Sequence, residues 1–171
     1  MNYRSEEGAV LPVALIMLLI LTVIGVAGMQ DTALQERMAG NMRDRNLAFQ
    51  AGESALRAGE KYLESAVLPA FNNTGGLLNK TYPSIRAGDP DFWESYPWST
   101  NSREYGTSFA ELSASPRYVI EEIPVVTAPV GESAKFGTLK ELRSYRVTSK
   151  GVGGTTDAVV ILQSTYRRQG D

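Results

Sequence analysis

The chain has 171 residues, with 17 lysines and arginines against 19 aspartates and glutamates. It contains no cysteine and no histidine, which excludes disulfide bonds, Ser-His-Asp and Cys-His catalytic sites and histidine-ligated metals. Because the basic residues are scattered, nucleic acid is not expected as a partner. We therefore expect one modest soluble domain that is not an enzyme and carries no cofactor or metal.

An uncharged run occupies residues 8–30 and is almost wholly apolar from Ala9 onward. At about 1.5 Å per residue, a helix of this length covers roughly 30 Å, the thickness of the hydrocarbon core of a bilayer. The run is longer than the apolar part of a signal peptide and has no small-x-small step at its far end. It predicts a membrane-spanning helix over residues 9–30 that stays with the chain.

The helical pattern continues beyond the apolar run, because apolar residues recur there at steps of four or seven with small residues between them. This stripe comprises Leu34, Met38, Met42, Phe49, Gly52, Leu56, Gly59 and Leu63. No proline interrupts the chain between Pro12 and Pro69. We expect one helix over residues 9–66, whose later part, residues 31–66, lays the stripe against the soluble domain.

Residues 67–116 are rich in proline, glycine and small polar residues, which predicts a long irregular connection. Two short helices are expected within it, over residues 91–95 and 109–112. Asp89 and Asp91 lack the ligands that follow in a calcium loop and are expected to cap the first of these helices.

Three later segments are β-branched and aromatic and predict strands, the last two joined as a hairpin through residues 151–157. They are residues 117–123, 144–150 and 158–167. We therefore expect an α+β fold in which the long helix packs on an antiparallel sheet of three or four strands within residues 117–171.

Some side chains are open to two interpretations. Trp93, Tyr96 and Trp98 could form a sugar-binding or partner-binding patch, although such residues more often anchor a long loop to the body. Glu111, Glu121 and Glu122 are expected to be surface charges, because no second catalytic group accompanies them.

A short polar leader, residues 1–8, ends in Gly8 directly before the apolar run, which starts at Ala9. This leader, with a membrane helix that continues into an α+β head, resembles a type IV prepilin. The resemblance implies that a prepilin peptidase cuts between Gly8 and Ala9 and that the new N-terminus at Ala9 is methylated. The leader departs from the family pattern, because it has one arginine against two glutamates where family leaders are usually basic.

The segment after the span is similar to the N-terminal region of the PilX-type minor pilins. The residues that carry the likeness are Gln35, Glu36, Arg37, Met38, Ala39, Gly40, Asn41, Arg43, Asp44, Arg45, Ala48, Phe49, Gln50 and Glu53. The resemblance implies a type IV pilin-like fold and a structural subunit that primes pilus assembly and supports twitching motility and adhesion. It implies an inner-membrane protein with its head in the periplasm, later incorporated into the pilus. Its implied partners are other minor pilins, the major pilin, the peptidase and methyltransferase, and a tip adhesin as a further candidate.

The fifth position after the expected cleavage site is Val13, where major pilins carry a glutamate. By resemblance, that glutamate neutralises the N-terminal ammonium of the subunit ahead, since a carboxylate in lipid is tolerated only with a partner. A subunit without it is expected at or near the filament tip. Two alternatives stay open: a K-like tip pseudopilin of a type II secretion system, and a single-span periplasmic ligand-binding protein that never enters a filament.

Overall fold

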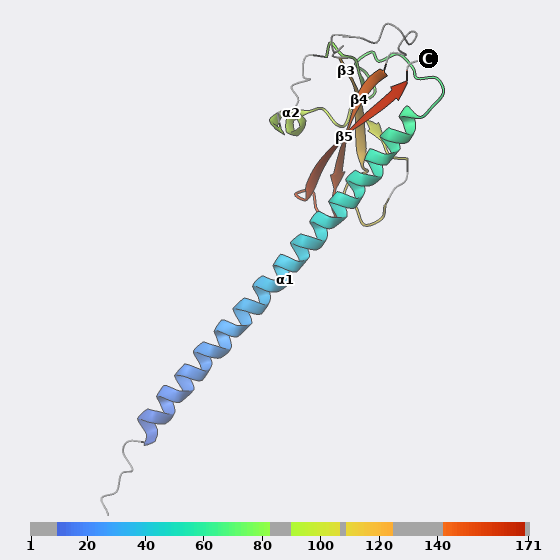
Figure 1. Cartoon of the computed structure of the whole chain (residues 1–171). Coiled ribbons are helices and arrows are strands. Elements are labelled where there is room, and N and C mark those ends of the chain that lie inside the picture. Colours follow the sequence, from blue (N-terminus) through green and yellow to red (C-terminus); the bar gives the residue numbers. More distant parts are fainter. Residues whose placement is uncertain (1–9, 83–89, 107–108, 125–141, 170–171) are drawn as a thin grey trace, which may run out of the picture. The chain divides into compact units, whose positions relative to one another are not determined.

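The structure is a computed structural model that describes residues 10–82, 90–106, 109–124 and 142–169. It comprises two units, Met1–Met42 and Arg43–Asp171, and the second is called the head below. One helix, α1 (Val10–Leu63), begins in the first unit and ends in the head (Figure 1). The predicted long helix is confirmed from Val10 onward, whereas Ala9 lies outside the described residues.

In the described part of the head, five strands form one sheet. They are β1 (Leu77–Leu78), β2 (Arg103–Glu104), β3 (Arg117–Ile123), β4 (Leu142–Val152) and β5 (Val159–Gln169). The last three are the predicted strands, and they pair antiparallel in chain order with β4 and β5 as the predicted hairpin. β1 and β2 share the other edge of β3, where β1 runs parallel to it and β2 antiparallel.

The expectation of a wholly antiparallel sheet of three or four strands was wrong in strand number and in the direction of β1. Both additional strands come from residues 67–116, which were expected to be irregular. A strand of two residues contains no alternating pattern, so its pairing depends on partners distant in the sequence. Here the amide of Ile120 donates to the carbonyl oxygen of Gly76 at 2.8 Å, and Gly76 has a φ of 76°, which favours glycine.

The two short helices predicted in the connection had different outcomes. Helix α2 (Pro90–Ser95) confirms the first, although the expected cap Asp89 lies outside the described residues. The second, residues 109–112, is only a turn, in which the amide of Leu112 donates to the carbonyl oxygen of Phe109 at 3.2 Å. One isolated turn fixes several dihedral angles for one hydrogen bond, so no helix grows from it.

The C-terminus of α1 is capped by a side chain of β5. The guanidinium of Arg168 donates to the carbonyl oxygens of Leu63, Ser65 and Ala66 at 2.5–2.9 Å. The last carbonyls of a helix have no partner within it and favour a cation. The helix ends at Leu63, before the predicted end at Ala66, and Arg168 stabilises this end.

Both faces of the sheet are covered, so the head has three layers where the sequence predicted two. Toward α1 the core comprises Ala55, Leu63, Leu77, Tyr118, Ile120, Tyr145 and Val147. On the other face a second core comprises Leu78, Trp93, Tyr96, Trp98 and Val119. Figure 1 shows α2 on the opposite side of the strands from the last turns of α1. Thr148 of β4, which is paired with Val119 of this second core, is fully buried.

Small residues form the face of α1 that packs on the sheet. The buried residues of the helix are Ala48, Ala51, Gly52, Ala55, Gly59 and Leu63. The predicted stripe was correct for Gly52, Gly59 and Leu63, and Leu56 packs half-buried against the same core. It was wrong for four other large members, which are 44–67% exposed: Leu34, Met38, Met42 and Phe49. Small residues are required because a Cβ on Gly59 would lie 2.5 Å from Cγ1 of Val147.

Candidate assembly interface

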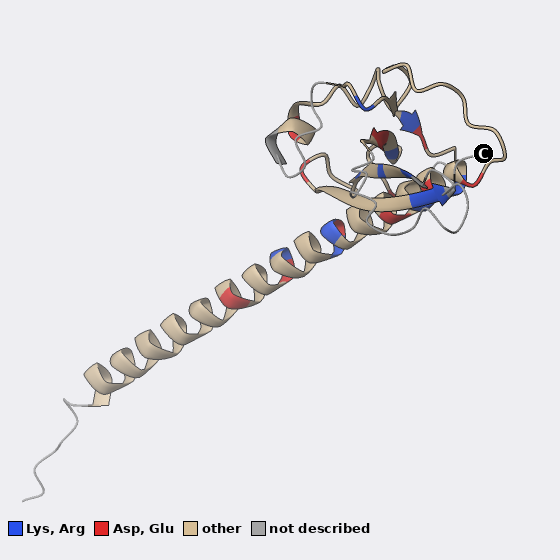
Figure 2. Cartoon of the chain, turned by 45° about the horizontal axis from the view of Figure 1, so that its top comes forward, with Lys and Arg blue, Asp and Glu red and all other residues tan. Residues whose placement is uncertain are grey.

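The first unit presents an uncharged, apolar helical surface. Figure 2 shows the early turns of α1 without charged residues, and the first charged residue of this helix is Asp31. The large apolar side chains of residues 10–29 are 49–76% exposed, Val13 among them at 53%. By length and composition this helix could cross a membrane. Such a surface is shielded from water when it contacts lipid or other apolar helices.

The residues of the predicted signature divide between the two units. Those of the first unit are all exposed: Gln35, Glu36, Arg37, Met38, Ala39, Gly40 and Asn41. Those of the head that are exposed are Arg43, Arg45, Phe49 and Gln50. Asp44 and Ala48 instead contact the β4–β5 hairpin, and Glu53 pairs with Arg57 one turn along the helix at 3.3 Å. The signature therefore combines a free helical surface with two residues that attach the helix to the sheet.

Asp44 clamps the hairpin between β4 and β5. Its carboxylate accepts a hydrogen bond from the amide of Gly154 at 2.5 Å, and from the amide of Thr155 at 3.3 Å. The hydroxyl of Thr155 donates to the same carboxylate. The hydrogen bond from this hydroxyl is the main cause that lowers the pKa of Asp44, and the bonds from the two amides lower it further. Desolvation raises the pKa, but by less than the hydroxyl lowers it. The helix is thus tied to a turn more than a hundred residues away.

Ala48 marks the closest approach of the helix backbone to the sheet. A Cβ on Gly151 of β4 would overlap with the carbonyl oxygen of Ala48 and the amide nitrogen of Gly52. A Cβ on Gly153 would likewise overlap with the carboxylate of Asp44. The glycines of the hairpin therefore let it lie directly against α1. From the sequence, these glycines were expected only to form the turn.

Two family models match the chain and together extend from residue 7 to residue 168. The model described as PilX N-terminal matches residues 7–57, and the model described as type IV pilus assembly protein PilX C-term matches residues 46–168. The chain belongs to the PilX family. Searches of curated proteins and of solved structures found no match.

This membership establishes the general function of the chain. A PilX-family chain is a minor pilin of the type IV pilus, a structural subunit that associates with other pilins. The exposed apolar helix of the first unit fits anchoring in a membrane followed by incorporation into the pilus. Within the described residues, histidine, cysteine and carboxylate side chains form no group of three that could hold a metal ion.

Removing the carboxylate of Asp44 from this PilX-family pilin should loosen the hairpin from the helix. We expect Asp44→Ala to lower the thermal midpoint of the full-length protein at pH 7, whereas Asp157→Ala, an exposed aspartate of the same turn, should not. Because the folded state lowers the pKa of Asp44, its stabilisation is present above the unfolded value and is lost as the pH falls through the folded value. The midpoints of Asp44→Ala and wild type should therefore converge at low pH, and equal midpoints at pH 7 would show that the clamp is not stabilising.

The aromatic residues of the connection are core residues of the PilX-family head. Trp93, Tyr96 and Trp98 are only 5–7% exposed. The indole of Trp98 donates to the carbonyl oxygen of Trp93 at 2.9 Å, and the hydroxyl of Tyr96 donates to that of Asn101 at 2.5 Å. The prediction that these residues anchor a loop is confirmed, and an exposed aromatic patch is excluded.

Glu121 is buried, so the prediction that it is a surface charge was wrong. Its side chain is 1% exposed, and neither carboxylate oxygen has a hydrogen-bond partner in the described part of the chain. Arg146 lies nearest, with Nη1 3.8 Å from Oε2. Burial raises the pKa of Glu121 to about 7, against the opposing effect of Arg146. Glu122 is half-buried and Glu111 is exposed, as expected for groups near the surface.

Proposed function

We propose that this minor pilin is cut between Gly8 and Ala9, methylated at Ala9 and assembled at or near the tip of the pilus. Gly8 and Ala9 lie outside the described residues, so processing is supported by the sequence and by the PilX family. Before assembly the helix of the first unit spans the inner membrane and the head lies in the periplasm. Val13 is the single observation that carries the position at the tip.

The apolar surface of the first unit supports a transfer from membrane to filament. In lipid and in a bundle of apolar helices, this surface is shielded from water equally well, so the exchange needs little hydrophobic free energy. Exposure to water is different, because each large apolar side chain left exposed costs about 1.5–3 kcal/mol. The helix is therefore retained by one apolar surrounding or the other and is not released between them.

The uncharged position 13 distinguishes this subunit from a shaft subunit. In major pilins the glutamate at this place pairs with the N-terminal ammonium of the subunit ahead. Val13 cannot neutralise a charge. If another subunit lay ahead of this one, the N-terminal ammonium of that subunit would be buried in an apolar core without a partner, which is unfavourable. A position with no subunit ahead avoids this penalty.

At the tip, the protein would prime assembly together with other minor pilins, before the major pilin extends the shaft. It would support twitching motility and adhesion, with a tip adhesin as its partner beyond the filament. These roles follow from the proposed position and from the family, and each depends on the protein reaching the pilus.

Two measurements on native protein test the proposal. The mass of the protein purified from membranes should correspond to a chain that starts at methylated Ala9, and an intact Met1 would reject processing. Gold-labelled antibody on isolated pili should mark the ends, and an even label along the shaft would reject the position at the tip.

Substitution of Val13 tests the electrostatic reason for that position. We expect Val13→Glu to move a fraction of the protein from pilus ends into the shaft, because the new carboxylate can pair with the ammonium of a subunit ahead. Val13→Gln is the matched control, since glutamine has nearly the same shape as glutamate but no charge. This variant should still be labelled by gold antibody at the pilus ends. The same distribution for both variants would contradict the charge argument.

A further inference from the structure

A pocket of about 360 Å³ opens where β3 begins and β4 ends. Pro97 and Ser99 line it from the loop after α2, and Ser115 lines it from the segment before β3. Arg117 and Lys150 line it from the sheet. Its size is at the lower end of the range for sites that hold one small ligand or one inserted side chain.

The two cations of the pocket face each other across neighbouring strands. Arg117 of β3 and Lys150 of β4 are directly opposed in the antiparallel register. Like charges at such a position destabilise a sheet unless each is compensated. The two side chains therefore have to be considered separately, by the partners that each of them has.

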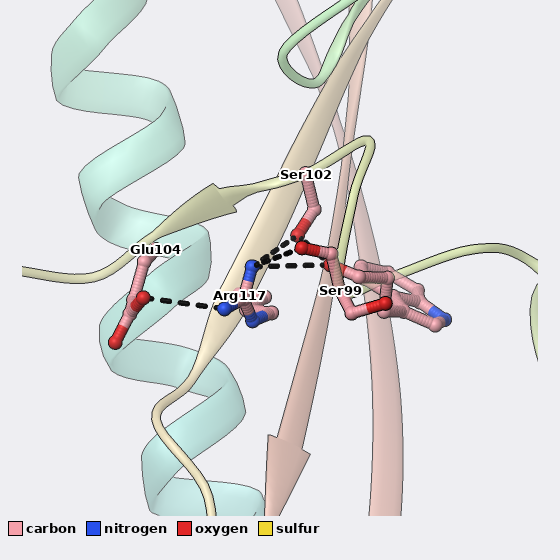
Figure 3. Close-up of polar contacts among 5 residues, drawn as sticks. Ser99, Ser102, Glu104 and Arg117 are labelled. Carbon is pink, nitrogen blue, oxygen red and sulfur yellow. Dashed lines mark hydrogen bonds and ion pairs between the residues drawn. The ribbon is translucent and has the colours of Figure 1, made fainter.

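Arg117 is compensated and held in place (Figure 3). Its Nη2 lies 3.2 Å from Oε2 of Glu104. Its Nη1 donates to the carbonyl oxygen of Trp98 at 3.1 Å and to the hydroxyl of Ser102 at 3.3 Å. These contacts make Arg117 a fixed wall of the pocket whose charge is already neutralised.

Lys150 has no such compensation. In the described part of the chain, no carboxylate lies within ion-pair distance of its ammonium. The ring of Trp98 has its centroid 5.9 Å from Nζ, at the outer limit of a cation–π contact. Among the described residues, the ammonium of Lys150 is therefore a positive charge without a counter-ion, in a pocket that the hydroxyl-bearing Ser99 and Ser115 also line.

We propose that this pocket binds a carboxylate, with Lys150 as the cation that recognises it. One free ammonium matches the single negative charge of a carboxylate, and hydroxyls can donate to its second oxygen. Binding would give the ammonium of Lys150 the compensation that Arg117 already has from Glu104. The same chemistry could come from an aspartate or glutamate of a neighbouring pilin or from a free acidic sugar.

The first experiment is a titration of the full-length protein in detergent micelles, followed by tryptophan fluorescence because Trp98 adjoins Lys150. Glucuronate is the probe, and glucose is the neutral probe of the same ring. We expect glucuronate to bind more tightly than glucose. Lys150→Met should weaken glucuronate binding about tenfold, since it keeps the length of the side chain and removes the charge. Lys80→Met, an exposed lysine outside the pocket, is the matched control and should leave binding unchanged.

The second experiment separates the two sources of the carboxylate. A carbodiimide joins an amine to a carboxylate only when the two are in contact. On isolated pili, an amide between Lys150 and an aspartate or glutamate of another pilin would identify the neighbouring subunit. Glucuronate binding without this cross-link would identify a free ligand.

Loss of both signals overturns the proposal: glucuronate binding that is no tighter than that of glucose or is unaffected by Lys150→Met, together with no cross-link at Lys150. The cross-link rests on the proposed function, whereas the titration does not. If the protein is absent from pili, the proposed function fails, and the titration alone still decides whether the pocket binds a carboxylate.

Discussion

Replacing Gly151 with alanine should lower the free energy of unfolding by about 3 kcal/mol, near the upper end of the usual penalty for overpacking. The new Cβ would overlap with backbone atoms of Ala48 and Gly52, which cannot turn away as a side chain can. The helix would have to move off the sheet, and the hydrogen bonds of Asp44 to the hairpin would be lost with it. Urea unfolding of the full-length protein in micelles, followed by tryptophan fluorescence, measures this change.

Two other glycines provide a graded comparison for Gly151→Ala. Gly106→Ala should have little effect, because no atom lies within 4 Å of the added Cβ. Gly59→Ala should fall between them, because Cγ1 of Val147 belongs to a side chain that can shift, and alanine is the better helix former by about 1 kcal/mol. If Gly151→Ala proved as stable as Gly106→Ala, the close approach of α1 to β4 would be wrong.

Glu121→Gln should make the head more stable at pH 8, by about 2–3 kcal/mol. Burial raises the pKa of Glu121 from 4.5 to about 7, which corresponds to about 3 kcal/mol between the two protonation states. The charged form is therefore the unfavourable one in the folded protein. Glutamine keeps the shape of the protonated side chain and cannot ionise. Arg146 loses its carboxylate partner in this variant, but its side chain is partly exposed, so water can solvate the guanidinium.

Ionisation of Glu121 should make the stability of the wild-type protein fall as the pH rises. Because its pKa is higher in the folded state, its contribution to stability is fully present below pH 4.5 and is lost as the pH rises through about 7. Wild type should lose stability over this interval, and Glu121→Gln should not show that loss. Glu111→Gln, at an exposed carboxylate, should follow wild type. The prediction fails if wild type and Glu121→Gln have parallel stability curves between pH 4.5 and 8, measured by the same urea unfolding.

The corrections to the sequence analysis share one physical cause. Phe49 was assigned to the buried stripe because it is large and apolar at a helical step, yet Ala48 and Ala51 pack on the sheet instead. Periodicity shows that a helix has an apolar face, but the distance between helix and sheet decides which face can approach. That distance is set by Gly151, which is far from Phe49 in the sequence. No local pattern carries this information.

Glu121 was misjudged for a similar reason. An antiparallel strand with one solvated face would leave its side chain at the surface. The layer of Leu78, Trp93 and Trp98 covers that face, and it is built from a connection that was expected to be irregular apart from two short helices. Burial of a charged side chain therefore followed from the packing of a distant segment.

The sequence by itself determined the uncharged apolar run, the single long helix that continues from it, the three long strands and the membership of the PilX family, because these depend on local periodicity and on residue types in order. Only the tertiary structure decided which residues of the helix meet the sheet, that Asp44 holds the hairpin, that Glu121 is buried and that Lys150 has no counter-ion among the described residues. Each of these depends on residues that are distant in the chain and adjacent in space. Charge and burial at such positions are properties of the packed layers, and a single segment of sequence does not contain them.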